Sequence, residues 1–263
     1  MRDEVLSWSA RKPREGTRKI GILDDVEYFG PQAANAFLKA LEEPPPGTYW
    51  ILLTSDLSNT LSTVRSRCQV LGFRPLAVEA LRSVINDRLQ EPIAAALAER
   101  GDDAVLPGGD EREFALRSAS GSPGRFLETL CDNLFPAREL LLGQLCGTAA
   151  ISPVEAADTL HQALARESDE NRDAFRERMK RTIGVAQSLA RDVHAALLGS
   201  TVFVNDDRSE ALWRVAEVAD AEAIVRLGDV LADLQEAVER NGNVKIIAAN
   251  MMLGLHGVSR RHR

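Results

Sequence analysis

The sequence predicts an α/β segment at the start of the chain, followed by an all-helical remainder. Two short apolar runs, residues 20–24 and 49–53, are typical of strands buried on both faces. A helical pattern lies between them, and a strand–helix–strand unit with short links places its two strands in parallel. After Pro75 the apolar residues recur at helical spacing to the end of the chain, with no further strand pattern.

The helix of the first segment is predicted from its apolar stripe and from its stop signal. The stripe follows the spacing i, i+3, i+4 and i+7 and consists of Ala34, Phe37, Leu38 and Leu41. Prolines at positions 44–46 then end the helix, because proline donates no backbone N–H and disfavours helical geometry in the residue before it.

The helical remainder is predicted to form two parts. Short helices separated by loops occupy residues 77–131, and the longer helices of residues 132–263 are typical of a bundle. This leaves residues 1–76 as the α/β segment. One helix start in the bundle carries a capping box with proline at the first helical position, formed by Ser152, Pro153 and Glu155.

The composition limits the class of protein. The chain has 263 residues, of which 44% are apolar, enough for a packed core, and its formal net charge is −7. A chain this acidic does not fit a stand-alone nucleic-acid coat, because phosphate binding needs a basic surface. Cys68, Cys131 and Cys146 have neither disulfide nor zinc spacing, which indicates a reducing cytoplasm. No apolar run reaches the ~18 residues of a membrane span.

Polar residues stand at the end of both predicted strands. Asp24 and Asp25 close the first run, and Thr54 and Ser55 follow the second. In an open parallel sheet, ligands bind beyond the carboxyl ends of the strands. Two carboxylates beside two hydroxyls suit a hydrated Mg²⁺ ion and an oriented water. The alternative is that Asp24 and Asp25 simply begin a loop and cap the next helix.

Several blocks of the sequence resemble the clamp-loader branch of the AAA+ ATPases. Residues 34–45 read ANAFLKALEEPP, and residues 65–68 read RSRC. Residues 119–128 resemble the lid-domain motif of that family, and residues 237–253 resemble a block near the end of its helical collar. The resemblance therefore spans most of the chain, although it is weak between about 132 and 225.

The resemblance implies a domain for each part of the chain. Residues 1–76 correspond to a partial AAA+ domain that carries the Walker B, sensor-1 and SRC motifs. Residues 77–131 correspond to a small helical lid domain. Residues 132–263 correspond to an all-α collar, which joins five subunits into a ring in the family.

The resemblance also implies nucleotide-binding positions. Asp24 and Asp25 fall at the Walker B box, where Asp25 replaces the usual catalytic glutamate. Its side chain is one methylene shorter, so its carboxylate sits ~1–1.5 Å back, and misplacement on that scale costs ~10²-fold in rate. Thr54 and Ser55 fall at the sensor-1 position, and Arg125 falls in the region of the sensor-2 arginine.

Arg67 matches the arginine finger of the family, which reaches the γ-phosphate of a nucleotide bound to the next subunit. A guanidinium suits this role because it is always charged and presents a planar fork of donors to phosphate oxygens. Ser66 and Cys68 flank it on the same implied interface, with Cys68 as a small spacer rather than a reactive thiol. The alternative is that Arg67 is a surface arginine paired with a carboxylate.

No G-x-x-x-x-G-K-[ST] phosphate loop occurs in these residues. In the family that loop precedes the portion present here, so we expect a truncated gene model, a misplaced start or a natural fragment. We expect no ATP hydrolysis by this chain alone and no firmly bound cofactor or metal, with ATP and Mg²⁺ held at the neighbouring subunit.

The resemblance favours a delta-prime subunit of bacterial DNA polymerase III over a gamma/tau subunit, because the Walker B box is DDVE and the chain ends just past the collar block. The implied function is to help load a sliding clamp on primed DNA. The implied partners are the gamma/tau and delta subunits, the sliding clamp, and primed DNA through the assembled complex, in the cytoplasm at the replisome and without a membrane. The alternatives are a truncated gamma/tau-like motor ATPase and a helical scaffold of unrelated purpose.

Overall fold

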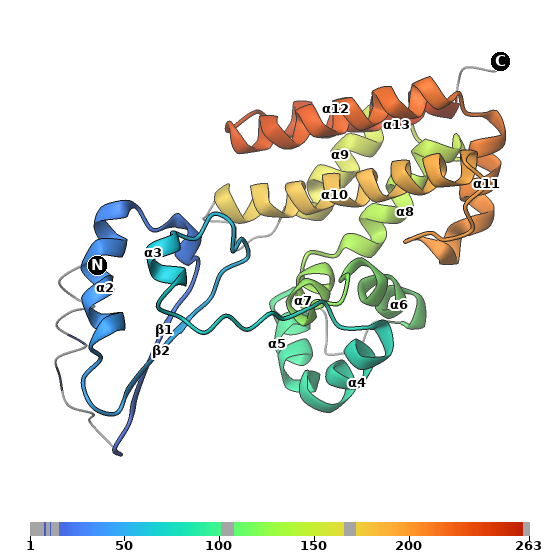
Figure 1. The fold of residues 1–263 in the computed structure, drawn as a ribbon. Helices are drawn as coiled ribbons and strands as arrows, with labels where there is room; N and C mark the ends of the chain where they lie inside the picture. The colour runs from blue at the N-terminus through green and yellow to red at the C-terminus, as the bar shows by residue number, and fades with distance from the viewer. Residues whose placement is uncertain (1–7, 9–10, 12–15, 101–107, 166–171, 260–263) are drawn as a thin grey trace. The chain divides into compact units, whose positions relative to one another are not determined.

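The computed structural model describes residues 8, 11, 16–100, 108–165 and 172–259. Its contacts divide the chain into two compact units, Met1–Arg74 and Pro75–Arg263 (Figure 1). The first unit holds a small sheet, and the described part of the second unit is helical. The predicted order of an α/β segment followed by helices is confirmed at this level. The three-part division at residues 76 and 131 stays a prediction.

The first unit contains a parallel strand–helix–strand motif. Its elements are β1 (Lys19–Leu23), the 3-10 turn η1 (Val26–Tyr28), α2 (Pro31–Glu42), β2 (Thr48–Leu52) and α3 (Ser62–Arg65). The two strands pair in parallel, with Lys19 opposite Thr48 and Leu23 opposite Leu52. Pro31 opens α2 at its first turn, where the missing N–H costs nothing. Both strands start one residue earlier than the sequence predicts.

One face of the sheet packs against α2 through aromatic rings. The rings of Phe37 and Trp50 meet edge-on, with centroids 4.8 Å apart. Trp50 also lies across Gly21, where an added Cβ would stand 2.3 Å from the indole ring. Ala34 and Phe37 of α2 are both buried. This packing explains why β1 carries a glycine in the middle of an otherwise apolar run.

The other face of the sheet is exposed, which corrects the prediction that both strands are buried on both faces. The exposed fractions of Ile20, Ile22, Tyr49 and Ile51 are 58%, 63%, 53% and 45%. Successive side chains of a strand point to opposite faces, so one helix covers only half of them. In the described residues α2 is the helix that covers this sheet, and it lies on one side.

The second unit begins with four helices around their own core. They are α4 (Val78–Arg88), α5 (Gln90–Arg100), α6 (Gly109–Ser118) and α7 (Pro123–Cys131). Their buried apolar cluster includes Leu81, Ile85, Ile93, Leu97, Phe126 and Leu130. Ser122 caps α7, since its hydroxyl accepts a hydrogen bond from the backbone of Arg125.

Longer helices complete the second unit around a larger core. They are α8 (Leu134–Cys146), α9 (Pro153–Leu164), α10 (Arg172–Leu197), α11 (Ser209–Val218), α12 (Ala221–Glu239) and α13 (Val244–Ser259), with a 3-10 turn η2 (Asp206–Arg208) before α11. In Figure 1, α10 and α12 run side by side across the bundle. The predicted capping box at Ser152 and Glu155 is present at the start of α9. None of the described helices combines the length and apolar composition that a membrane span requires.

A buried arginine links the two helical clusters of the second unit. Arg138 of α8 is fully buried and donates hydrogen bonds to both carboxylate oxygens of Asp207, at 2.9 and 2.8 Å. Its guanidinium also lies over the rings of Phe114 in α6 and Phe135 in α8, 4.4 and 5.0 Å from their centroids. A second carboxylate, that of Glu139, accepts from the same guanidinium. Buried charges persist in folded proteins when they are paired in this way.

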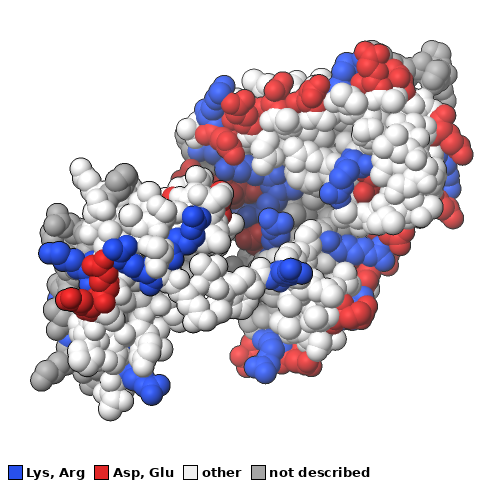
Figure 2. All heavy atoms as spheres, viewed as in Figure 1, with Lys and Arg blue, Asp and Glu red and all other residues white. Residues whose placement is uncertain are grey.

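Surface charges of both signs are interspersed on the visible face of the second unit. Figure 2 shows basic and acidic side chains alternating there, with uncharged residues between them. Many of the pairs are spaced one helical turn apart, as in Arg214 with Glu210 and Arg226 with Glu222. Such exposed pairs add little stability individually.

We predict that Arg138→Met destabilises the fold by about 2–4 kcal/mol, because Asp207 loses its two short hydrogen bonds and keeps only the ion pairs with Arg117 and Arg208. The matched control is Arg214→Met, whose arginine forms an exposed pair on α11 and should cost less than about 0.5 kcal/mol. Urea unfolding followed by circular dichroism measures both. Equal free energies of unfolding for the two variants would contradict the role of Arg138.

The same pair predicts a pH dependence. Burial raises the pKa of Asp207, but the hydrogen bonds and charge of Arg138, together with the charges of Arg208 and Arg117, outweigh burial and leave the pKa below its ordinary value. A carboxyl whose pKa is lowered by folding stabilises the fold above its unfolded pKa, and that contribution is lost as the pH falls. The difference in stability between the wild type and Arg138→Met should therefore narrow below about pH 4. A constant difference down to acid unfolding would exclude this coupling.

Candidate functional site

The candidate site begins where the two strands of the first unit end. The backbone pairing continues past both strands, since Leu53 N–H donates to the carbonyl of Leu23 at 2.8 Å and Val26 N–H donates to that of Leu53 at 3.1 Å. Between them the chain turns at Asp25, whose φ of 53° lies in the left-handed region. The Asp24 carboxylate accepts the Asp25 N–H at 2.9 Å. Both aspartates are exposed, at the strand end where the sequence predicts them.

The carboxylate that joins the two strand ends is that of Glu27. Its Oε1 accepts hydrogen bonds from the backbone N–H of Ser55 at 3.1 Å and from the Ser55 hydroxyl at 2.7 Å. The hydrogen bond from the Ser55 side chain, with help from backbone N–H groups and Thr54, lowers the pKa of Glu27 from 4.5 to about 2. The sequence predicts Asp24 and Asp25 next to Ser55 and misses Glu27. The 3-10 turn η1 brings Glu27 back toward β2.

Thr54 also takes part in the hydrogen bonds of the loop that follows β2. Its hydroxyl lies 3.1 Å from the Thr60 hydroxyl and accepts the N–H of Asp56 at 3.1 Å. The Asp56 carboxylate in turn accepts from Ser58 and from the N–H of Asn59 at 3.1 Å. These hydrogen bonds, from Ser58 first, lower the pKa of Asp56. The loop after β2 is thus shaped by its own side chains.

Arg67 lies just after α3 and is paired within its own unit. Its Nε donates to Oε1 of Glu42 at 2.5 Å, and Nη2 forms an ion pair with the same oxygen. Nη1 donates to the carbonyl of Thr63 at 2.9 Å. The side chains of Arg67 and Glu42 keep 34% and 45% of their surface exposed. The carboxylate-paired alternative for Arg67 is therefore present, and the guanidinium is still accessible from solvent.

The residues that flank Arg67 differ in their exposure. Ser66 is exposed, and its hydroxyl donates to the carbonyl of Thr63 at 3.1 Å. Cys68 is partly buried, and burial raises the pKa of its thiol. A raised thiol pKa keeps the fraction of reactive thiolate low. The chemistry of Cys68 thus agrees with a spacer.

Arg125 lies in the second unit, whereas the other candidate residues lie in the first. It occupies the first turn of α7, where its N–H donates to the Ser122 hydroxyl at 3.4 Å. Its side chain is exposed. The sensor-2 role of Arg125 stays a prediction, as does Mg²⁺ binding near Asp24. Among the described residues, no three His, Cys, Asp or Glu side chains are grouped as a metal site requires.

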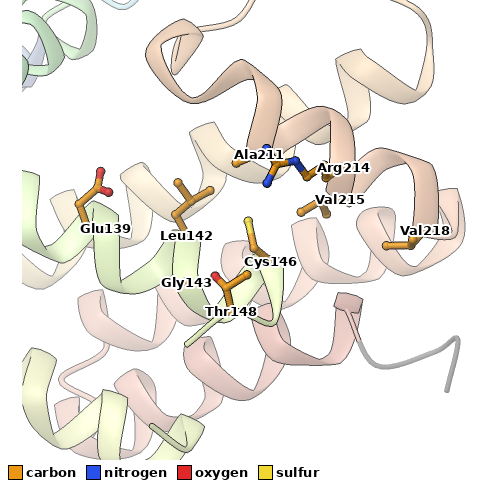
Figure 3. Close-up of a pocket in the computed structure, with 9 residues that line it drawn as sticks. All are labelled: Glu139, Leu142, Gly143, Cys146, Thr148, Ala211, Arg214, Val215 and Val218. Carbon is orange, nitrogen blue, oxygen red and sulfur yellow. The ribbon is translucent and has the colours of Figure 1, made fainter. Parts of the chain in front are cut away.

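The second unit also contains a pocket of about 280 Å³ between α8 and α11 (Figure 3). Side chains of α8 face those of α11 across it, and the lining is mostly apolar. Its lining residues are Glu139, Leu142, Gly143, Cys146, Thr148, Ala211, Arg214, Val215 and Val218. Burial raises the pKa of the Cys146 thiol, although Arg214 opposes this. None of the site residues predicted from the sequence lines this pocket.

Comparison with known proteins identifies the class to which the first unit is related. A sequence model of the family described as "DNA polymerase III, delta subunit" matches residues 3–77. This range contains the strand–helix–strand motif, the loop around Glu27 and the RSRC block. The predicted resemblance to DNA polymerase III subunits is confirmed.

Individual relatives are DNA polymerase III subunits of two kinds. Subunit delta-prime of Bacillus subtilis (strain 168) is 40% identical over 77 residues, which are 29% of this chain and 22% of the relative. Subunit delta-prime of Escherichia coli (strain K12) is 30% identical over 138 residues, 52% of this chain and 36% of the relative. Subunit gamma/tau of Mycobacterium tuberculosis (strain ATCC 25618 / H37Rv) is 28% identical over 155 residues, 58% and 25% of the two chains. The matched part of the chain thus spans between 22% and 36% of the length of these three relatives.

A solved structure was also compared with the chain. It is a DNA polymerase III gamma subunit-related protein from Thermotoga maritima, and the match covers 98% of this chain and 79% of that one, with 19% sequence identity. Its TM-score is 0.42, so the likeness carries no argument about the fold.

We predict that the carboxyl group of Glu27 titrates with a midpoint near pH 2 in the folded protein. The hydrogen bonds from Ser55 stabilise the charged form of the Glu27 carboxyl group. They therefore hold the 24–27 turn to β2 above this midpoint, and the turn is released as the pH falls below the midpoint. Carbon-13 chemical shifts of the labelled carboxyl group measure the midpoint. Ser55→Ala removes the hydroxyl donor and should raise the midpoint of Glu27. A midpoint of 4.5 in the wild type would show that Ser55 does not bind the Glu27 carboxylate.

Proposed function

We propose that this chain is a clamp-loader subunit of bacterial DNA polymerase III, of the delta-prime kind, which supplies Arg67 in trans to a neighbouring ATPase subunit. The observation that carries the proposal is the place of Arg67. It stands at the surface, just after α3, in the RSRC block of the segment that the family model matches.

The geometry around Arg67 supports a role at an interface. The guanidinium is held by Glu42 and by the Thr63 carbonyl, and 34% of the Arg67 side chain is exposed. Once released from these partners, an exposed arginine presents a planar fork of donors to a phosphate of another subunit. When that phosphate gains charge in the transition state, the guanidinium stabilises it. Ser66 and Cys68 lie on the same proposed interface.

The remaining candidate residues fit the same proposal. Asp24 and Asp25 stand at the Walker B position, Thr54 and Ser55 at sensor 1, and Arg125 at sensor 2. The exposed aspartates at the strand ends support a nucleotide-facing edge. We propose that residues 1–76 form part of an AAA+ domain, that residues 77–131 form a lid, and that residues 132–263 form the collar.

The proposal includes partners and a place in the cell. The chain assembles with gamma/tau and delta subunits in the cytoplasm and acts at the replisome. Through that complex it helps to place a sliding clamp on primed DNA. ATP and Mg²⁺ are held by the neighbouring subunit, whose hydrolysis Arg67 assists. Membership of a DNA polymerase III complex is supported by the relatives that bear the delta-prime and gamma/tau names.

A second candidate function is a gamma/tau-like motor subunit that binds and hydrolyses ATP. The matches to tau and gamma/tau subunits favour it, including the one that covers 58% of this chain. The two candidates differ in what the isolated chain does. A motor subunit binds ATP by itself, whereas a delta-prime subunit acts through its neighbour.

We predict that Arg67→Ala lowers the ATPase rate of the assembled complex at least about tenfold, because the neighbouring site loses a cation that stabilises its transition state. Assembly, measured by gel filtration, should be intact. The control is Arg65→Ala, which removes an exposed arginine two residues away whose Nη1 donates to the Leu57 carbonyl at 3.2 Å. That variant should keep the rate within about twofold. An Arg67→Ala complex with the wild-type rate would reject the finger.

We predict no ATPase activity above background for the isolated full chain, measured by phosphate release. Asp24→Asn is the matched variant, since it removes the Walker B carboxylate. Hydrolysis by the wild-type chain that Asp24→Asn abolishes would favour the motor subunit instead.

A further inference from the structure

We infer that Glu42 is a positioning residue for Arg67, which holds the guanidinium in a resting place until a phosphate of the neighbouring subunit displaces it. The inference rests on the proposed function, because it concerns how the same arginine is kept ready. The residue that carries it lies in a different element, 25 positions earlier in the chain.

The contact uses most of the guanidinium. Nε and Nη2 of Arg67 both bind one oxygen of the Glu42 carboxylate, and Nη1 donates to the Thr63 carbonyl and to the Ser66 hydroxyl, at 2.9 and 3.4 Å. In this position the fork points at its own unit. An arginine that binds a phosphate through the same donors must first leave the carboxylate, so the two anions compete for one cation.

The position of Glu42 makes it a suitable holder. It is the last residue of α2, and the following residue, Glu43, ends the helix by donating its N–H to the Lys39 carbonyl. A carboxylate at a helix C-terminus is disfavoured by the helix dipole, so Glu42 gains more than most carboxylates from an adjacent cation. The prolines at 44–46 fix the chain just after it. Its location relative to α3 is therefore set by the fold.

The exposure of the pair allows it to exchange. With 34% of the Arg67 side chain and 45% of the Glu42 side chain exposed, the pair is screened by water and salt and binds weakly. A triphosphate carries more charge than one carboxylate and presents more acceptor oxygens. The carboxylate therefore holds Arg67 when the neighbouring site is empty and yields it when that site is filled.

The kinetic consequence is specific. The Glu42 carboxylate competes for Arg67 only while the neighbouring site is empty. It therefore weakens the binding of ATP and of the transition state by the same amount, and its removal changes KM rather than kcat. Glu42→Gln keeps the size of the side chain and removes its charge. In the assembled complex it should lower the KM for ATP about threefold, the range that one exposed ion pair supplies, with kcat within about twofold of wild type.

The chain offers a matched control in Glu43. It is the next residue, equally acidic and exposed, and its side chain is not the one that binds Arg67. Glu43→Gln makes the same change of net charge at the end of α2. It should leave both KM and kcat within about 1.5-fold of wild type, since it removes no competitor of the phosphate.

A second measurement tests the contact without any ATPase activity. Phenylglyoxal modifies arginine, and in the isolated full chain a paired guanidinium reacts slowly. Arg67 should react at least about threefold faster in Glu42→Gln than in wild type or in Glu43→Gln, with Arg65 as the internal reference in the same peptide digest. Melting temperatures check that all three proteins are folded.

The outcomes separate this inference from the proposed function. If Arg67→Ala lowers the ATPase rate but Glu42→Gln leaves KM unchanged, the finger stands and the holding role of Glu42 is overturned. Equal phenylglyoxal rates in wild type and Glu42→Gln also overturn it. If Arg67→Ala has no effect on the rate, the proposed function fails and the inference fails with it. In the double variant Arg67→Ala/Glu42→Gln, the effect of Glu42→Gln on KM must disappear.

Discussion

The parallel register between β1 and β2 fixes where the candidate residues at the strand ends lie. Because Leu23 stands opposite Leu52, both strands end at the same edge, and the backbone of Val26 can bind that of Leu53. This pairing sets the turn at Asp25 and delivers Glu27 to Ser55. The register depends on Gly21, whose lack of a side chain lets Trp50 lie across the sheet toward α2. A slip of one residue would send these side chains to the opposite face.

Much of the fold could be predicted from local signals. The prolines around α2, the apolar runs of the strands and the capping box of α9 act within a few residues, so the sequence shows them directly. The exposed face of the sheet was not predictable in this way. A continuous apolar run is the same whether one or both faces are covered, and the difference depends on how many helices pack against the strands. The burial of Arg138 likewise depends on partners distant in sequence.

The candidate site was predictable at the level of segments rather than of contacts. Asp24, Asp25, Thr54 and Ser55 do lie at the strand ends, as a parallel sheet requires. Glu27 and Glu42 were missed because their partners are 28 and 25 residues away, and nothing local marks a carboxylate as the one that will reach them. In the sequence DDVE, Glu27 follows Asp24 by three residues, which is one turn of a 3-10 helix. A 3-10 turn predicted at this place would have indicated that Glu27 returns toward the strand ends. For Arg67, pairing with a carboxylate was predicted as an alternative, but Glu42 was not identified as the partner.

The guanidinium of Arg138 ties helix α6 to helix α8 and to the turn before α11. To separate the smaller helical cluster from the larger one, the chain would have to draw this charge away from the Phe114 ring of α6 and away from its carboxylates. Arg138 therefore connects the smaller helical cluster to the larger one through a single buried cation that is paired with two carboxylates.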